Sequence, residues 1–280
     1  MSGSQITKTA DSSVFGYCTS DNSIESLDKS IESFARLEQG KVPIISCEGW
    51  VNLFEKINQS ELFPRLDVDA DIVLYIRPPL EWLNSAFWQW GAWTNATLDR
   101  WLNSNIEKAN WSRYIDKWEK VCGVKSVNVR LATTDVVADF MSFLEVDKFK
   151  ISHSNNFSSS PDLLRFLLRN RKYREGPHHP HYEFVVNKFL NLQRSQAPWV
   201  LPEEFQKRAL SHLRGDQLTL EKKITREMWQ KIENDQRWWD QSVYAEKQIL
   251  KPNDESNLES ADRLISSLIE KINLSKLDIN

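Results

Sequence analysis

The sequence has few cysteines and few glycines for its length. Its 280 residues include three cysteines and eight glycines. Cys18, Cys47 and Cys122 form no Cys-x-x-Cys pair and have no histidine at the spacing of a metal site. Neither a disulfide-stapled fold nor a zinc module is therefore predicted, and a reducing compartment is the expected environment. So little glycine also excludes fibrous and low-complexity chains.

A strong excess of charge of one sign is also absent. The chain has 36 Lys plus Arg against 39 Asp plus Glu, a formal net charge of -3. A general nucleic-acid-binding protein needs a basic excess to neutralise phosphates, so we expect no nucleic-acid partner and only a local anion site. The first residues lack the basic and apolar regions of a signal peptide, and no run approaches the roughly 20 apolar residues of a membrane helix. We expect a soluble, cytoplasmic protein.

The apolar residues, 40% of the chain, follow patterns that predict an α/β region. Spacings of three and four predict a helix over Ile24 to Leu37. Short continuous apolar runs predict buried strands at Val42 to Ser46 and Asp71 to Ile76. A valine-rich segment predicts a third strand at Val124 to Leu131. The polar, serine-rich opening as far as Asn22 has no clear period, so we expect a loop there.

The remaining periodic segments are predicted to be helical. A long aromatic region over Glu81 to Trp118 is expected to break near Gly91 and Asn110. Thr134 or Asp135 is expected to cap a helix ending at Leu144, and Ser160 with Pro161 resembles an N-cap and first-residue pair. Further helices are predicted at Trp50 to Ile57, Glu183 to Leu192, Glu203 to Leu213, Thr225 to Tyr244 and Ala261 to Ile272.

Strands separated by helices indicate an α/β fold. We predict a three-layer αβα arrangement with a mostly parallel sheet over about residues 24–150, continued by a helical part over about 151–250. Residues 1–250 are expected to form a single domain, and residues 251–280 a helical C-terminal tail.

The segment from Ile76 to Trp90, IRPPLEWLNSAFWQW, is the most informative. A buried strand delivers Arg77 at its end, two prolines turn the chain, and Ser85 follows eight positions after Arg77. Ligands of open α/β sheets bind at the carboxyl ends of the strands. A guanidinium and a hydroxyl at that edge suit a phosphate. The alternative is that Arg77 pairs with a carboxylate such as Glu48 or Glu81 and that Ser85 has no role beyond the helix.

A strand, an arginine, a proline two residues on and a serine at plus eight followed by an aromatic residue resemble the 3′-phosphate-binding motif of sulfotransferases that use 3′-phosphoadenosine 5′-phosphosulfate (PAPS). The segments PIISCEGW, VNVRLATTDVVADFMSFL and SNNFSSSPDLLRFLLR are also similar to bacterial members, and the likeness covers about residues 40–245. The resemblance implies a P-loop-like α/β fold and PAPS as co-substrate, with no metal required. It also implies that Arg77 and Ser85 contact the 3′-phosphate.

The sequence departs from this family at the phosphosulfate loop. The family's first strand runs into a loop of the type Lys-Thr-Gly-Thr, which cradles the 5′-phosphosulfate. The candidate upstream of Val42 is Lys8-Thr9, followed by Ala10-Asp11, and a polar terminus is the alternative role for this stretch. The first strand is accordingly expected to be missing, either because the chain begins late or because the sheet is rearranged.

Two groups are candidates for proton transfer. Glu48, after the predicted strand ending at Ser46, is the candidate general base for an acceptor hydroxyl, and an ion pair with Arg77 is its alternative role. His178, His179 and His181 are candidate bases or metal ligands, with a solvated turn as the alternative.

Two compositional clusters complete the candidate surfaces. A basic run, which either binds an anion or ends a helix favourably, comprises Arg165, Arg169, Arg171, Lys172 and Arg174. Seven of the twelve tryptophans lie between Trp82 and Trp118. Trp88 and Trp90 cannot share one helical face, because residues two apart point about 200° apart. At least one is expected to line a cleft or a partner surface, where an indole suits a purine or a sugar.

The resemblance thus implies transfer of a sulfuryl group from PAPS to a hydroxyl, with a saccharide as the expected acceptor. The first alternative is an inactive relative that binds a glycan or a protein through its Trp-rich helices. The second is an unrelated α/β nucleotide-binding domain in which Arg77 forms a structural ion pair.

Overall fold

A computed structural model describes residues 6–7, 15–19, 23–34, 42–46, 48–132, 135–145, 159–190, 198–250 and 267–268. The chain divides into two compact units, each described here by itself. Unit 1 comprises Met1–Ile76, Trp111–Arg130 and Thr219–Met228, and unit 2 comprises Arg77–Asn110, Leu131–Leu218 and Trp229–Asn280.

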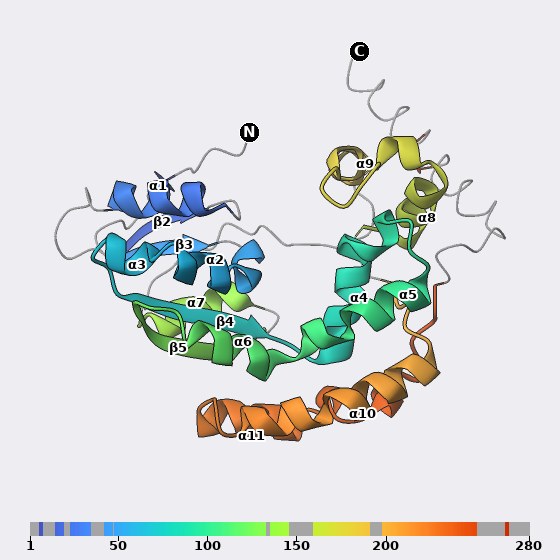
Figure 1. Ribbon diagram of the computed structural model, residues 1–280. Helices are drawn as coiled ribbons and strands as arrows, with labels where there is room; N and C mark the ends of the chain where they lie inside the picture. The colour runs from blue at the N-terminus through green and yellow to red at the C-terminus, as the bar shows by residue number, and fades with distance from the viewer. Residues whose placement is uncertain are drawn as a thin grey trace, which may run out of the picture. The chain divides into compact units, whose positions relative to one another are not determined.

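Unit 1 contains a three-stranded sheet in the order β1-β2-β3. The strands are β1 (Ile6–Thr7), β2 (Phe15–Thr19) and β3 (Val42–Ser46). β1 is antiparallel to β2, whereas β2 is parallel to β3 in a register that pairs Phe15 with Val42. Parallel neighbours need a crossover connection, and helix α1 (Ile24–Phe34) lies in that connection (Figure 1).

The expectation of a loop as far as Asn22 is therefore wrong for β1 and β2, and so is the expectation that no strand precedes Val42. Phe15 to Thr19 contains a glycine and shows no clean alternation of apolar residues. The neighbouring strand β3 nevertheless supplies partners for its backbone groups. Strand formation depends strongly on such tertiary pairing, so local pattern did not reveal it.

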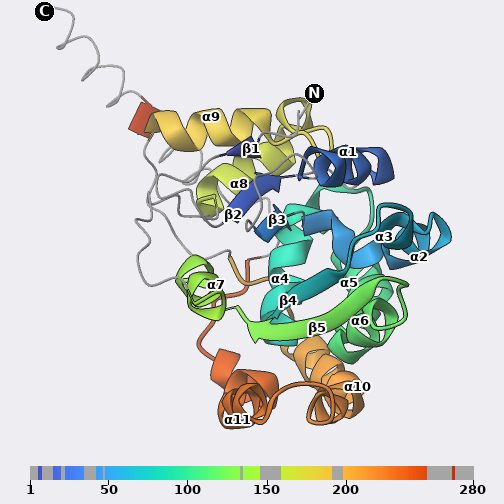
Figure 2. The same ribbon diagram turned by 90° about the vertical axis from the view of Figure 1, so that its left-hand side faces the viewer.

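A second sheet in unit 1 pairs β4 (Ala70–Ile76) with β5 (Val124–Leu131). The backbone N–H of Ala70 donates to the carbonyl of Gly123 at 2.8 Å, and the Ser126 hydroxyl donates to the Asp71 carboxylate. Both contacts join the beginnings of the strands, so β4 and β5 run in the same direction, side by side in Figure 2. The predicted strands at Val42 to Ser46 and Val124 to Leu131 are confirmed, and the strand predicted at Asp71 to Ile76 begins one residue earlier, at Ala70.

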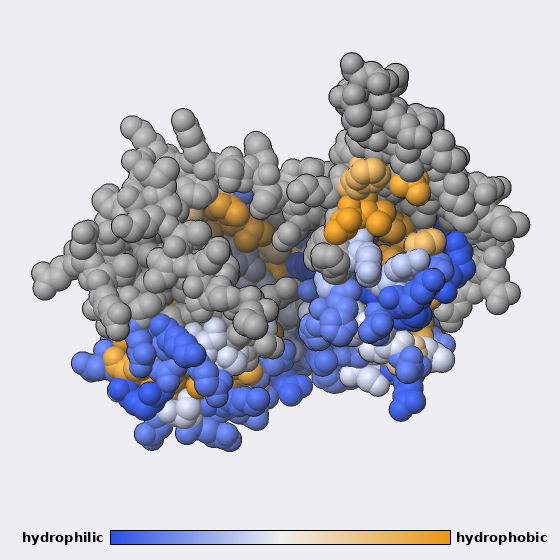
Figure 3. All heavy atoms as spheres, turned by 90° about the horizontal axis from the view of Figure 1, so that it is seen from above, coloured by the Kyte–Doolittle hydropathy of each residue, from blue (hydrophilic) through white to orange (hydrophobic). Residues whose placement is uncertain are grey.

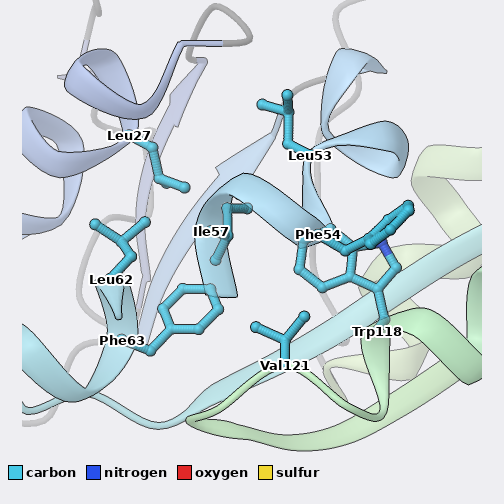
Figure 4. Close-up of a cluster of buried hydrophobic side chains, with 8 residues drawn as sticks. All are labelled: Leu27, Leu53, Phe54, Ile57, Leu62, Phe63, Trp118 and Val121. Atoms are coloured by element: carbon cyan, nitrogen blue, oxygen red, sulfur yellow. The ribbon is translucent and has the colours of Figure 1, made fainter. Parts of the chain in front are cut away.

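Short helices pack their apolar side chains together in unit 1 (Figure 4). They are α1, which supplies Leu27, with η1 (Glu48–Asn52), α2 (Phe54–Gln59), α3 (Leu62–Arg65) and α6 (Trp111–Trp118). The cluster comprises Leu27, Leu53, Phe54, Ile57, Leu62, Phe63, Trp118 and Val121. Gly123 at the entry to β5 has a φ of 84°, and an added Cβ would lie 2.5 Å from the Phe63 Cβ. Glycine is therefore required at this turn.

The described part of unit 2 is built mainly of helices. They are α4 (Pro79–Gln89), η2 (Gly91–Trp93), α5 (Leu98–Asn105), η3 (Ile106–Ala109), α7 (Val136–Phe143), α8 (Pro161–Arg169), η4 (Arg171–Tyr173), α9 (His181–Leu190), η5 (Gln236–Trp238) and η6 (Gln241–Tyr244). α10 (Glu203–Leu220) and α11 (Arg226–Asn234) each contain residues of both units.

Several predicted helix boundaries are confirmed in unit 2. The breaks near Gly91 and Asn110 are present. The Ser160 hydroxyl accepts from the Leu163 N–H at 3.3 Å with Pro161 as the first residue of α8, and the Asp135 carboxylate accepts from the Ala138 N–H at the start of α7.

Two predicted helices are interrupted. The helix expected over Thr225 to Tyr244 ends at Asn234. Asp235 and Asp240 then cap two new turns, because their carboxylates accept from the N–H groups of Arg237 and Ser242. Such side chains compete with helix continuation. The helix expected over Trp50 to Ile57 is also divided, between η1 and α2.

The described residues thus form a mixed α/β fold with paired parallel strands and a helix-rich second half. None of the described helices is long and apolar enough to cross a membrane. The predicted helix over Ala261 to Ile272 lies outside the described residues apart from two helical positions. Hydrophilic residues dominate the coloured surface in Figure 3, with apolar residues in smaller patches.

Candidate functional site

The candidate site is built at the start of α4. Arg77 directly follows the last residue of β4 and is half-buried. Pro78 and Pro79 are both buried, and Pro79 is the first residue of the helix. Proline suits this position because its φ is already helical and the missing N–H needs no partner. The chain thus passes from strand to helix where the sequence predicted it, and α4 carries Ser85.

Ser85 lies on the less buried side of α4. Glu81, Trp82, Ser85 and Gln89 are half-buried or exposed. Residues three and four apart are neighbours on a helix surface, so these four side chains form one continuous strip, which we call the open strip of α4. The opposite positions are buried: Leu80, Leu83, Asn84, Ala86, Phe87 and Trp88. Ser85 is therefore partly exposed, as its predicted contact with a 3′-phosphate requires.

Two side chains of the same motif, those of Asn84 and Trp88, form hydrogen bonds that stabilise the fold. Asn84, 4% exposed, donates from Nδ2 to the Pro198 carbonyl at 3.1 Å and accepts from the Val200 N–H through Oδ1 at 2.9 Å. Trp88 Nε1 donates to the same Pro198 carbonyl at 2.6 Å. These bonds hold the segment before α10 against α4. Sequence reasoning missed this role of Asn84, for which an amide among apolar helix positions was the available signal.

Glu81 has a partner other than the one considered from sequence. Its carboxylate lies 3.3 Å from Arg237 Nη1. Asp235 binds the same guanidinium, with 2.7 Å between Arg237 Nη2 and Asp235 Oδ2. The hydrogen bonds that Arg237 donates to the Asp235 carboxylate, together with the negative charge of Glu81, raise the pKa of Arg237. Glu81 and Arg237 thereby link the first turn of α4 to η5.

Two other predicted site residues, Glu48 and Lys8, stand outside this description of the site. Glu48 begins η1 in unit 1, whereas Arg77 belongs to unit 2. The Glu48 side chain and the whole of Lys8 lie outside the described residues. Their predicted roles as base and loop lysine stay predictions.

Arg174 of the basic run is a buried structural residue. Its side chain is 5% exposed and forms an ion pair with Glu183 of α9. The guanidinium carbon lies 3.8 Å from the centroid of the Trp93 ring, and Nη2 donates to the Gln89 carbonyl at 3.3 Å. Burial lowers the pKa of Arg174 to about 10, which leaves it charged at neutral pH. Arg174 therefore joins the end of α4 to α9.

The Glu183 carboxylate is part of a larger buried polar group. It accepts a hydrogen bond from the Ser159 hydroxyl, which in turn accepts from Asn187 Nδ2 at 2.6 Å. Ser159 is 4% exposed. This network ties the start of α8 to two successive turns of α9.

The other cations of the run do not share one environment. Arg165 is half-buried and lies 3.6 Å from Asp162, whereas Arg169, Arg171 and Lys172 are exposed. The run therefore divides between Arg174, which is buried, and cations that are exposed at the end of α8 and just after it. A solvated helix end was the alternative considered from sequence.

The histidine-rich segment forms no metal site within the described residues. His178 and His179 are exposed, and the side chain of His181 at the start of α9 lies outside the description. Among the described side chains, no group of three or more His, Cys, Asp or Glu residues is placed to hold a metal ion.

The tryptophans divide between core and surface. Trp88 is 5% exposed, whereas Trp90, just after the end of α4, is half-buried. Trp90 contacts Trp82 of the open strip, with ring centroids 6.4 Å apart. The site therefore combines an arginine, a serine and a pair of indoles at one helix.

Comparisons with known proteins found no matching family model, no matching curated protein and no matching solved structure.

Proposed function

We propose that this protein is a sulfotransferase that moves a sulfuryl group from PAPS to a hydroxyl group of a carbohydrate. The observation that carries the proposal is the accessible position of Ser85 on the open strip of α4, eight residues after Arg77. Asn84 and Trp88 in the same motif are occupied by structural hydrogen bonds. Ser85 instead lies on the less buried side of the same helix.

The proposed chemistry needs positioning and positive charge, with no metal. Arg77 and Ser85 would hold the 3′-phosphate, because a fixed guanidinium and a hydroxyl both donate hydrogen bonds to phosphate oxygens. The acceptor oxygen forms a bond to sulfur as the bond from sulfur to the 5′-phosphate oxygen breaks. The acceptor proton passes to a base, for which Glu48 is the candidate. The products are a sulfate ester and adenosine 3′,5′-bisphosphate.

The order of elements in unit 1 supports a P-loop-like fold. β2, α1 and β3 form a strand-helix-strand unit with parallel strands. In folds of this kind, anions bind between the first strand and the helix N-terminus. Here α1 begins after Ser23, whose hydroxyl accepts from the Ser26 N–H at 3.0 Å. Residues 20–22 of this connection lie outside the described residues.

Calorimetric titration with adenosine 3′,5′-bisphosphate tests the proposal. Arg77→Ala is expected to weaken binding about thirtyfold, and Ser85→Ala about fivefold, because the guanidinium adds an ion pair to its hydrogen bonds whereas the neutral hydroxyl gives one hydrogen bond. Arg214→Ala, which removes an exposed arginine of α10, is the matched control and should leave the affinity unchanged. Equal affinities for the Arg77→Ala variant and the unsubstituted protein would refute the assignment.

A second candidate function is nucleotide or glycan binding without transfer. It is favoured by the residues between β2 and α1, Ser-Asp-Asn-Ser, which include no lysine or arginine to meet a phosphosulfate. Incubation with 35S-labelled PAPS and a mixture of oligosaccharides separates the two functions. Labelled product supports the enzyme, whereas bound nucleotide with no labelled product supports the binding protein.

A further inference from the structure

Trp82 of the open strip and Trp90, just after the end of α4, form a pair of half-buried tryptophans in contact with each other. Trp82 precedes Ser85 by three residues, and Trp90 follows the last residue of α4. Their ring centroids are 6.4 Å apart and their planes are tilted by 57°. Ser85 and Gln89 lie on the same strip. The strip therefore combines an angled aromatic surface with a hydroxyl and an amide.

The helix end that carries this surface is held in place from within unit 2. Trp93 Nε1 donates to the Trp88 carbonyl at 2.6 Å, and Arg174 Nη2 donates to the Gln89 carbonyl. These bonds satisfy carbonyl groups that a helix C-terminus leaves without intrahelical partners. A recognition surface on such a fixed element loses little conformational entropy when a ligand binds.

The geometry discriminates between two kinds of ring. A planar base held between two indoles requires nearly parallel ring planes, which the 57° tilt does not provide. A pyranose chair is thicker and irregular, and the apolar hydrogens on one of its faces pack against an indole while its hydroxyl groups need polar neighbours. The Gln89 amide is a group of that kind, whereas the Ser85 hydroxyl is assigned to the 3′-phosphate.

The charge on the strip favours a neutral sugar. Its charged member, Glu81, is an acid whose carboxylate is paired with Arg237. The guanidinium of Arg237 also contacts Asp235, so this trio carries no positive excess that would attract an acidic sugar.

We infer that Trp82 and Trp90 form the stacking surface for a neutral pyranose ring of the acceptor. The assignment of this ring as an acceptor rests on the proposed function, but the stacking surface does not. A gluco-configured ring is a suitable probe, because its axial hydrogens form an apolar face that packs against an indole.

Saturation-transfer NMR and calorimetry with chitotriose, a neutral trisaccharide of N-acetylglucosamine, test the inference on the full chain. Trp90→Ala and Trp82→Ala are each expected to weaken chitotriose binding about tenfold. Trp239→Ala is the control, since Trp239 is also half-buried in unit 2 and contacts another indole, that of Trp229, at 5.9 Å. It should leave the affinity within about twofold. Circular dichroism melts confirm that each variant is folded.

Titration of the same variants with adenosine 3′,5′-bisphosphate separates this inference from the proposed function. Unchanged nucleotide affinity with lost trisaccharide affinity in Trp90→Ala supports the stacking surface. Loss of nucleotide affinity instead would overturn it in favour of a base platform, and so would absence of trisaccharide binding by the unsubstituted protein at 10 mM, roughly the weakest affinity that such contacts give. Trisaccharide binding without any nucleotide binding would refute the transferase while leaving the saccharide site intact.

Discussion

Unit 1 and unit 2 are stabilised by different kinds of buried side chain. The described interior of unit 1 is an apolar cluster around Ile57 and Leu62. Unit 2 buries polar and charged groups as well, namely Asn84, Ser159, Arg174, Gln206, Asp216 and Gln217, whereas Ser112 is the buried polar residue of unit 1 within the described residues. Apolar packing is non-directional, but buried polar groups need specific partners. Unit 2 therefore depends more on individual contacts.

The largest expected effect is in unit 2, at Arg174. Arg174→Ala leaves the Glu183 carboxylate buried without its cation, so we expect the free energy of unfolding to fall by about 4 kcal/mol. Urea unfolding followed by circular dichroism measures it. The double variant Arg174→Met with Glu183→Leu should recover most of the loss, because no unpaired charge remains.

An ion pair of unit 1 is the matched control. Arg65 lies 2.8 Å from Asp28, but its side chain is 46% exposed. Arg65→Ala is therefore expected to cost less than about 1 kcal/mol. Equal losses for Arg65→Ala and Arg174→Ala would remove the distinction between the units.

The next effect is in the apolar cluster of unit 1. Leu62 is 0% exposed. In Leu62→Ala the shorter side chain buries less apolar surface and leaves a cavity. We expect a loss of about 3 kcal/mol in the same unfolding measurement. Leu218→Ala, at a leucine that is 50% exposed, should change the stability by less than about 0.5 kcal/mol. A small loss at Leu62 would mean that unit 1 is not organised around this cluster.

The smallest effect concerns an exposed polar contact of unit 2. The Ser242 N–H and hydroxyl donate to the Asp240 carboxylate at 2.8 and 2.7 Å, and these bonds lower the pKa of Asp240. A lowered pKa stabilises the folded state above the pKa of the unfolded chain. This contribution is lost as the pH falls through the folded value.

Ser242→Ala keeps the backbone bond and removes the hydroxyl bond. We therefore expect the pKa of Asp240 to rise part of the way toward its ordinary value, which an NMR titration of the carboxyl carbon measures. Ser211→Ala, at an exposed serine of α10, should leave it unchanged. An unaltered pKa in Ser242→Ala would show that the backbone bond alone sets the shift.

The elements that local pattern predicted best are those with a strong period or a cap. Strands β3 and β5 occupy the predicted residues, and Ser160 with Pro161 opens α8 as expected. Strand β2 was missed because its partner β3 begins 27 positions after Phe15. The structural role of Asn84 was missed for the same reason, since its partner Val200 is 116 residues away. Pairing with such a distant residue does not change the local spacing of apolar residues, so the local pattern cannot predict it.

The candidate site likewise has features that the local sequence predicted and features that depend on distant residues. Strand, prolines and helix around Arg77 and Ser85 followed from the sequence, because a proline pair and helical spacing are local signals. Which residues of that helix are buried was not evident, and neither was the assignment of Arg174 to the interior. Both depend on segments folding back onto α4.

By itself, the sequence determined the strand and helix types, the caps and the eight-residue spacing from Arg77 to Ser85. Local backbone preferences and apolar periodicity act over a few residues, so they are visible without a fold. The tertiary structure alone decided that Ser85 lies on an open strip, that Trp82 and Trp90 contact each other, and that Arg174 is enclosed between α4 and α9. Burial and hydrogen-bond partners come from residues distant in the chain, and packing is what brings them together.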